Sequence, residues 1–299
     1  MNNRIHALLA ISMFWTGAVL AQYGTPATLQ AELPYGSDLS FSVSKAELTP
    51  SSILANTVFI PVGASQEKLP AVVVHHTCGG ISDHIYQWTA AALREGYSVL
   101  VLDTLSPRSL KIDCGSPSKI PNGRWVKDEL DAVAYLAAQP FVDPRYISVV
   151  GFSKGGLAAT WLSSPAIANA VRPGTPQVAA AVSLYALCAL PVTRGRPQGA
   201  VVLQPDTSRP LLMLLGEKDN ELSPESCIQE LPVRKAAGAP VEWFVYPNTT
   251  HAWDMAERDG FTKPSPINGE KVVYRYNKDA TEDAKLRVFD FLKRYARAR

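Results

Sequence analysis

Six short segments of the chain are nearly continuous in apolar residues. They are residues 71–76, 97–103, 146–151, 178–186, 210–216 and 241–247. Short apolar runs of this kind are typical of strands that are buried on both faces. The pattern therefore predicts a sheet that lies inside the molecule, with other elements covering both of its sides.

Helical patterns alternate with these segments. They cover residues 84–96, 124–139, 154–164 and 281–299, and Gly96, Pro140 and Pro165 end the first three. Strands that alternate with helices predict an α/β fold with a mostly parallel central sheet flanked by helices on both faces. Ligands of such sheets bind beyond the carboxyl ends of the strands, so functional residues are expected there.

The remaining regions are less regular. Residues 41–48 and 56–63 alternate or run apolar like the two strands of a hairpin. Residues 22–40 are rich in Gly, Pro and Ser, which predicts an extended entry segment. Residues 187–209 and 260–280 carry no clear period, and the first of these two regions is a candidate for a loop over the site.

The first 21 residues have the pattern of a secretory signal peptide. Arg4 precedes a mostly apolar run over residues 7–20, and Val19 and Ala21 supply small side chains for cleavage after Ala21. The run is interrupted by polar residues and is shorter than the roughly 20 residues that span a bilayer. We therefore expect an exported protein, periplasmic or secreted, with no stable membrane anchor and with residues 22–299 as a single domain.

Composition adds little about partners. The 299 residues are 46% hydrophobic, which is enough for the core of one α/β domain. Basic and acidic residues number 29 and 27, and the net charge of +2 shows no basic stripe that would favour nucleic acid. No nucleic-acid partner is expected, and the sequence leaves the oligomeric state open.

The four cysteines are best explained by export. Cys78, Cys114, Cys188 and Cys227 lack the CxxC spacing of zinc sites, and an even number in an oxidising compartment indicates disulfides. Three pairings are possible, and one or both pairs could instead be free buried thiols. We favour Cys78 with Cys114 and Cys188 with Cys227, since each pair would join loops that leave neighbouring strands.

Ser153 lies in the sequence GFSKG, directly after one predicted strand and before a predicted helix. This is the context of the G-x-S-x-G nucleophile elbow, in which the serine hydroxyl is exposed at the top of a sheet. Gly151 and Gly155 leave room for the tight turn. The alternatives are an incidental serine in a glycine-rich turn and a helix cap.

A nucleophilic serine needs a general base and an orienting acid, which follow it in the order acid and then histidine in this fold. His251 is the one histidine that follows Ser153, and it lies just after the strand at 241–247. Asp219 comes just after the strand at 210–216. Glu217 and Asp254 are the alternative acids, and His251 could also be a loop residue without a role.

Two backbone N–H groups are expected to form the oxyanion hole. One belongs to Lys154, the residue after the nucleophile, and the other to Cys78 in the glycine-containing loop after the strand at 71–76. His75 and His76 point to opposite faces of a strand, which argues against a metal site formed by them together with His84. This chemistry needs no metal and no cofactor.

Taken together, these motifs resemble the dienelactone hydrolase family of α/β-hydrolases. The resemblance runs from about residue 69 to the end and rests on LPAVVVHHTCGG, VLDTLSPRS, GFSKGG, LLGEKD, HAWD and the last helix. It looks most like exported, serine-containing members with four cysteines. It implies an α/β-hydrolase fold and hydrolysis of small carboxylic esters or lactones, through an acyl-enzyme on Ser153.

Two departures from the family pattern argue against dienelactone itself as the substrate. The elbow holds Ser153 where dienelactone hydrolase has cysteine, and Thr77 stands where it has glutamate. The resemblance also draws attention to Arg108, which could bind an anionic substrate group or form a salt bridge, for instance to Asp113. The alternative functions are a peptidase or acyltransferase with the same three residues, or a binding protein on a hydrolase scaffold.

Overall fold

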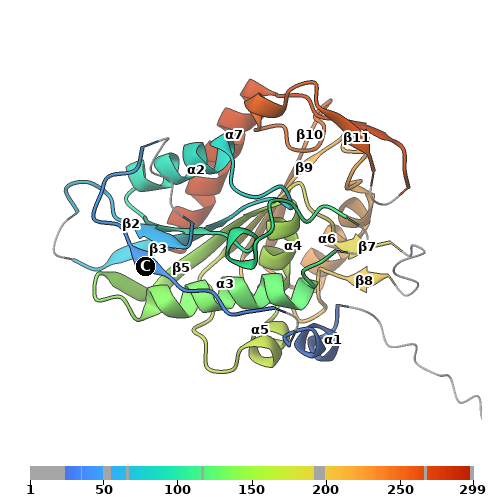
Figure 1. Ribbon diagram of the computed structural model, residues 1–299. Helices are drawn as coiled ribbons and strands as arrows, with labels where there is room; N and C mark the ends of the chain where they lie inside the picture. Colours follow the sequence, from blue (N-terminus) through green and yellow to red (C-terminus); the bar gives the residue numbers. More distant parts are fainter. Residues whose placement is uncertain are drawn as a thin grey trace, which may run out of the picture.

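The computed structural model describes residues 24–34, 36–49, 55–64, 67–115, 118–191, 199–265 and 268–296. The predicted signal peptide, residues 1–21, lies outside the described residues. An eight-stranded sheet crosses the molecule in the order β1-β2-β4-β3-β5-β6-β9-β10 (Figure 1). Its strands are β1 (Ser42–Val43), β2 (Thr57–Phe59), β3 (Leu69–His75), β4 (Ser98–Leu102), β5 (Val142–Phe152), β6 (Ala181–Leu184), β9 (Leu211–Gly216) and β10 (Val241–Tyr246).

Neighbouring strands of this sheet run parallel, except β2 and β4, which are antiparallel. The six short apolar segments overlap β3, β4, β5, β6, β9 and β10, as predicted. The predicted hairpin of residues 41–48 and 56–63 is wrong, because β1 pairs with β2 in parallel. Residues Thr57–Phe59 are fully buried, and their antiparallel partner is β4, so the edge strand β1 takes the other side of β2.

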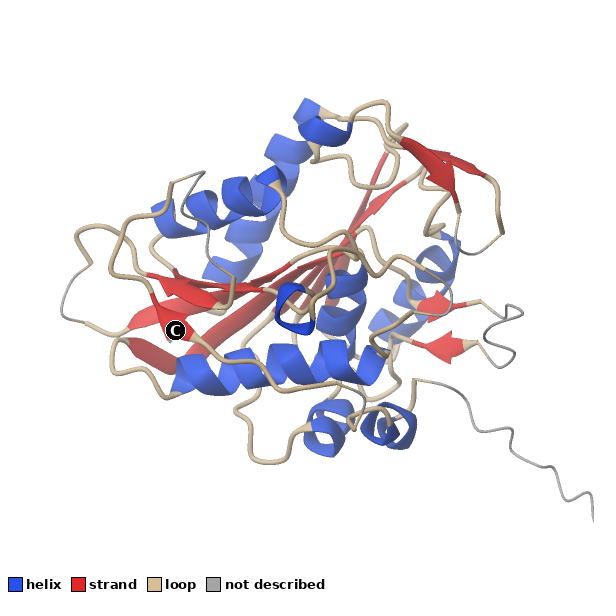
Figure 2. Ribbon diagram, viewed as in Figure 1, coloured by secondary structure: helices blue, strands red, loops and turns tan. Residues whose placement is uncertain are grey.

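Helices cover both faces of the sheet (Figure 2). They are α1 (Pro26–Ala31), α2 (Asp83–Arg94), α3 (Asn122–Ala137), α4 (Lys154–Trp161), α5 (Pro165–Val171), α6 (Glu225–Ala236) and α7 (Lys278–Lys293). The molecule has a hydrophobic core on each face of the sheet, and successive residues of β3 pack in opposite cores. Val72 and Val74 pack with α2 and α7, whereas Ala71 and Val73 pack with α3 and α4. The α/β architecture predicted from the alternating pattern, a mostly parallel sheet with helices on both faces, is therefore present.

The Gly, Pro and Ser content of the N-terminal segment predicted an extended chain. This prediction is wrong, because the segment contains helix α1. Thr25 caps helix α1 by accepting the N–H of Thr28, and a proline occupies the first turn, both of which favour a helix start. Leu29 of α1 is fully buried. A Cβ atom added to Gly123 of α3 would lie only 2.1 Å from the carbonyl oxygen of Leu29, so the two helices are in close contact here. Arg124 of α3 donates hydrogen bonds to the carbonyls of Leu33 and Ser37. The segment is thereby attached to α3.

Helices α5 and α6 and two small pairs of strands were not predicted. Helix α6 contains Pro232, a residue that argues against a helix interior. The irregular regions each form a small antiparallel pair, β7 (Ala189–Leu190) with β8 (Ala200–Val201) and β11 (Thr262–Pro264) with β12 (Lys271–Val273). Within the described residues, no helix combines the length and the apolar composition needed to cross a bilayer.

Candidate active site

Ser153 occupies the sharp turn between β5 and α4. Its backbone has φ 52° and ψ −110°, a strained conformation for a residue with a side chain. A Cβ atom on Gly151 would lie 2.2 Å from the carbonyl oxygen of Gly155, and one on Gly155 would lie 2.6 Å from the carbonyl oxygen of His75. Only glycine fits at these two positions, so the flanking glycines are what allows β5 to turn directly into α4.

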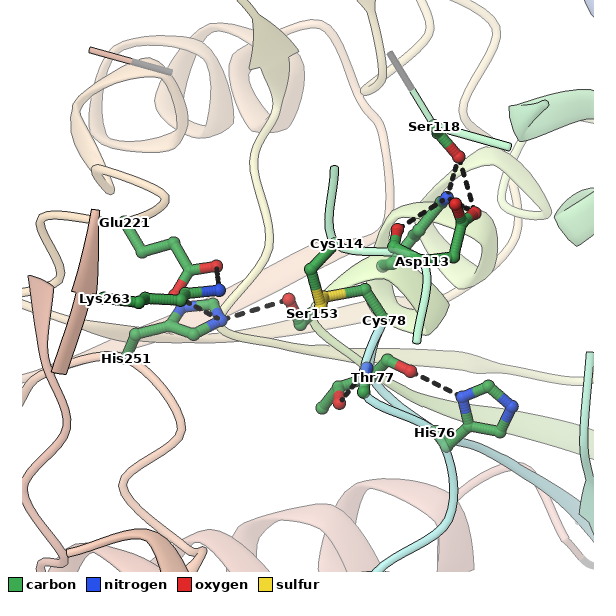
Figure 3. The surroundings of a disulfide bond; sticks show 12 residues. His76, Thr77, Cys78, Asp113, Cys114, Ser118, Ser153, Glu221, His251 and Lys263 are labelled. Carbon is green, nitrogen blue, oxygen red and sulfur yellow. Dashed lines mark hydrogen bonds and ion pairs between the residues drawn. A yellow bond between two sulfur atoms is a disulfide. The ribbon is translucent and has the colours of Figure 1, made fainter. Parts of the chain in front are cut away.

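Ser153, His251 and Asp219 are hydrogen-bonded in series. Figure 3 shows the link between Ser153 and His251. The Oγ atom of Ser153 lies 3.0 Å from Nε2 of His251, and Nδ1 of His251 lies 2.7 Å from Oδ2 of Asp219. All three side chains are buried. With a proton on Nδ1, the imidazole donates to Asp219 and accepts the hydroxyl hydrogen of Ser153.

The acid is held by its own loop. The backbone N–H groups of Glu221 and Leu222 donate to Oδ1 of Asp219 at 3.0 and 2.8 Å, which directs Oδ2 toward His251. Glu217, the first alternative acid, is exposed and accepts the N–H of Asn248. Asp254, the second alternative, accepts hydrogen bonds from Trp88 and Tyr185. Of the three acids considered, Asp219 is therefore the one that contacts His251.

The surroundings of His251 favour its charged form. Burial of the ring lowers its pKa, but the negative charges of Asp219 and Glu221 and the hydrogen bond to Asp219 outweigh burial, so the pKa of His251 is raised. Oε2 of Glu221 lies 3.9 Å from Nε2 of His251. Glu221 is buried and binds Lys263 at 2.6 Å and the hydroxyl of Tyr274 at 2.7 Å. Glu221 was not among the site residues predicted from the sequence.

The two predicted oxyanion donors belong to segments that border Ser153. Lys154 is the first residue of α4, so its backbone N–H belongs to the first turn of that helix. Cys78 lies in a tight turn after β3, in which the N–H of Gly80 donates to the carbonyl of Thr77 at 3.1 Å. In Figure 3, Ser153 lies between His251 and the disulfide of Cys78.

The cysteines pair as the sequence analysis favoured. One disulfide joins Cys78 to Cys114 and the other joins Cys188 to Cys227. The first ties the turn after β3 to the loop after β4, and the second ties the loop after β6 to α6. A pocket of about 390 Å³ lies near the second disulfide, and its wall includes Leu187, Pro191 and Glu221.

Known proteins are similar to this chain in sequence and in fold. The model of the dienelactone hydrolase family matches residues 54–296. The chain belongs to the dienelactone hydrolase family. A relative from Salmonella typhimurium, named "Putative carboxymethylenebutenolidase", is 28% identical over 214 residues, which are 69% of this chain and 76% of the relative. A protein of the same name from Escherichia coli K12 is 27% identical over 213 residues, 69% of this chain and 75% of its own length.

A crystal structure from Klebsiella pneumoniae, titled as that of a "Putative Dienelactone Hydrolase", has the same fold. It superimposes with a TM-score of 0.59 at 24% identity, covering 79% of this chain and 91% of the other. As a member of the dienelactone hydrolase family, the chain is a hydrolase that acts on esters or lactones.

Within this dienelactone hydrolase family member, Arg108 forms a salt bridge, which was one of its two expected roles, but with Asp128 and not with Asp113. Its guanidinium forms a bidentate ion pair with Asp128 at 2.7 and 2.9 Å, and it also donates to the carbonyls of Thr104 and Ser37. The predicted contact with an anionic substrate group is not supported, because these acceptors occupy both terminal nitrogens. The alternative partner, Asp113, is bound to Lys154 instead.

The histidines at the end of β3 also have structural partners. His75 contacts Glu129 at 2.8 Å and Thr104 at 3.0 Å, and its ring stacks on Trp125. His76 contacts the carbonyl of Thr77 at 2.5 Å, which supports the turn that carries Cys78. Among the residues that the structure describes, no three His, Cys, Asp or Glu side chains form a group suited to a metal ion.

Proposed function

We propose that this protein hydrolyses small carboxylic esters or lactones with Ser153 as nucleophile, His251 as general base and Asp219 as the acid that orients the histidine. The observation that carries the proposal is the continuous hydrogen-bonded series from Ser153 Oγ through His251 to Asp219, at 3.0 and 2.7 Å. These are hydrogen-bond distances, and the order of the three residues along the chain is that of the α/β-hydrolases.

The steps follow from this geometry. His251 takes the proton of Ser153 as Oγ attacks the ester carbonyl, and Asp219 stabilises the imidazolium. The backbone N–H groups of Lys154 and Cys78 stabilise the oxyanion. His251 then gives its proton to the departing alcohol, which leaves an acyl group on Ser153. Water, activated by His251 in the same way, releases the acid and restores the hydroxyl.

The first test is chemical labelling of the purified mature protein. Wild type is expected to react with a fluorophosphonate probe and to hydrolyse p-nitrophenyl acetate. Ser153→Ala should lose the label and at least 10⁴-fold in kcat. Ser208→Ala, which alters an exposed serine, is the matched control and should keep both. A wild-type protein that is not labelled and does not hydrolyse esters would refute the proposal. A preference for peptides as substrates would show that the protein is a peptidase, and acyl transfer to added alcohols would show that it is an acyltransferase.

We also propose that the chain is exported and cleaved after Ala21, to act in the periplasm or outside the cell. Two disulfides, Cys78–Cys114 and Cys188–Cys227, support this because they persist in oxidising compartments. Expression of the full chain in a Gram-negative host, followed by mass spectrometry of the exported fraction, should give an N-terminus at Gln22. An intact N-terminus in the cytosolic fraction would contradict export.

A further inference from the structure

Asp113 and Cys114 are adjacent in the loop after β4, and they contact both segments that carry the proposed oxyanion donors. Cys114 forms the disulfide with Cys78 (Figure 3). Asp113 forms an ion pair with Lys154. Neither contact involves the reacting atoms of Ser153 or His251. The two contacts nevertheless converge on one short segment of chain.

The attachment of Cys78 is double. Besides the disulfide, the backbone N–H of Asp113 donates to the carbonyl oxygen of Cys78 at 2.8 Å. The covalent bond restrains the side chain of Cys78, and the hydrogen bond restrains the peptide plane on its C-terminal side. Together they fix the position of the Cα atom of Cys78, to which the backbone nitrogen of the proposed donor is bonded, through groups outside the turn.

The attachment of Lys154 is an ion pair inside the protein. Its ammonium lies 2.6 Å from Oδ2 of Asp113, contacts Ser118 Oγ, and lies 4.7 Å from the centre of the Trp125 ring. The side chain of Asp113 is 1% exposed and that of Lys154 is 11% exposed. Burial raises the pKa of the Asp113 carboxyl, but the charge and hydrogen bond of Lys154 outweigh burial and lower it. Removal of one partner of such a pair leaves an uncompensated buried charge.

We propose that Asp113 and Cys114 are positioning residues that set the separation of the two oxyanion donors, the N–H groups of Lys154 and Cys78. We call this pair the 113–114 clamp. The inference rests on the proposed function, since it needs Ser153 to form an oxyanion. Donors of this kind act only when they are held within about 0.5 Å of the productive position, and loss of one costs about 10²–10³-fold in rate.

The test distinguishes an effect on the position of the oxyanion donors from an effect on the stability of the protein. Cys78→Ala/Cys114→Ala keeps the N–H of residue 78 but removes the covalent bond, and Cys188→Ala/Cys227→Ala is the matched control at the other disulfide. The measurements are kcat/KM and KM for p-nitrophenyl acetate and Ki for a trifluoromethyl ketone, which adds to serine to give a tetrahedral oxyanion. Thermal unfolding verifies that each variant is folded.

The clamp predicts that kcat/KM falls about 10–100-fold in Cys78→Ala/Cys114→Ala and that Ki rises by a similar factor, with KM within about threefold. The control variant Cys188→Ala/Cys227→Ala should stay within twofold of wild type in kcat/KM and in Ki. Equal losses of kcat/KM in the two disulfide variants, or an unchanged Ki in the first, would overturn the inference.

A second pair of variants addresses the ion pair. Asp113→Asn should lower kcat/KM about 10-fold or more and should raise Ki for the trifluoromethyl ketone by the same factor. Asp113→Asn/Lys154→Met removes both charges, so it should recover stability without recovering kcat/KM. Full recovery of stability and of kcat/KM in the double variant would mean that Asp113 contributes only to stability, which would contradict its positioning role. If Ser153→Ala kept the wild-type rate, the proposed function would fail together with the clamp, whereas an inert Ser153→Ala beside fully active clamp variants would refute the clamp alone.

Discussion

The carboxylate of Glu221 lies 3.9 Å from Nε2 of His251, the same nitrogen that accepts the hydrogen bond of Ser153. Lys263 of β11 and Tyr274, just after β12, hold this carboxylate in place. The ring of Tyr274 also packs near the imidazole, at 5.7 Å between ring centres. His251 is therefore faced by two carboxylates, Asp219 on Nδ1 and Glu221 on the side of Nε2.

Glu221→Gln should shift the acid limb of the kcat/KM profile to lower pH. His251 works as a base only when neutral, so activity is lost as the pH falls through its raised pKa. The substitution removes one negative charge that raises this pKa and leaves Lys263, whose positive charge lowers it. Tyr274→Phe keeps the carboxylate and is the control. An acid limb that stays in place or moves to higher pH in Glu221→Gln would contradict the assignment.

Asp219→Asn should lower kcat by about 10³–10⁴-fold with little change in fold, because asparagine can favour the wrong tautomer of His251. Steady-state hydrolysis of p-nitrophenyl acetate measures this directly. Glu217→Gln changes the exposed carboxylate two residues earlier and should stay within twofold of wild type. The reverse ranking of the two variants would return Glu217 to consideration as the acid.

Glu129→Gln should cost less than about 1 kcal/mol in the free energy of unfolding at pH 7. Burial raises the pKa of Glu129 well above its ordinary value and lowers the pKa of His75 well below its ordinary value, and both shifts favour a protonated acid beside a neutral imidazole. Glutamine can replace the donor to Nδ1. Glu129→Leu leaves that nitrogen without a donor and should cost about 1–3 kcal/mol more, as measured by urea unfolding. Equal costs would show that the carboxylate charge matters.

The two disulfides should contribute similarly to stability. They close loops with sequence separations of 36 and 39 residues, for which the chain-entropy relation gives about 4 kcal/mol each. Urea unfolding of Cys78→Ala/Cys114→Ala and Cys188→Ala/Cys227→Ala should therefore show comparable losses in the free energy of unfolding. A loss confined to one of the two variants would contradict the entropic account.

The parts of the protein that local patterns specify could be predicted from the sequence. The six inner strands are apolar on both faces, and Ser153, Asp219 and His251 each follow one of them, so their meeting at one edge follows from the topology. The preferred cysteine pairing followed from the same order of strands. Helix α1 was missed although its start signal, Thr25 before a proline, was present in the sequence.

The parts that depend on distant partners could not be predicted. Arg108 lies in a loop that could face a substrate, and nothing local in the sequence indicates that Asp128, on helix α3, neutralises it. Glu221 and Lys263 are 42 residues apart, and Asp113 and Lys154 are 41 apart. Each is an ordinary surface-type residue by composition, and only the packing of loops brings the charges together in buried positions.

The attachment of the N-terminal segment to α3 has a consequence for the order of folding. Glu32 accepts the N–H of Gly123, and Arg124 binds the carbonyl of Leu33, each across 91 residues of sequence. A chain that is synthesised from its N-terminus thus holds α1 without these partners until α3 has also emerged. Contacts of such high sequence separation form late, because loop closure precedes them. The first part of the domain to leave the ribosome therefore cannot dock on α3 before residues Gly123 and Arg124 have emerged.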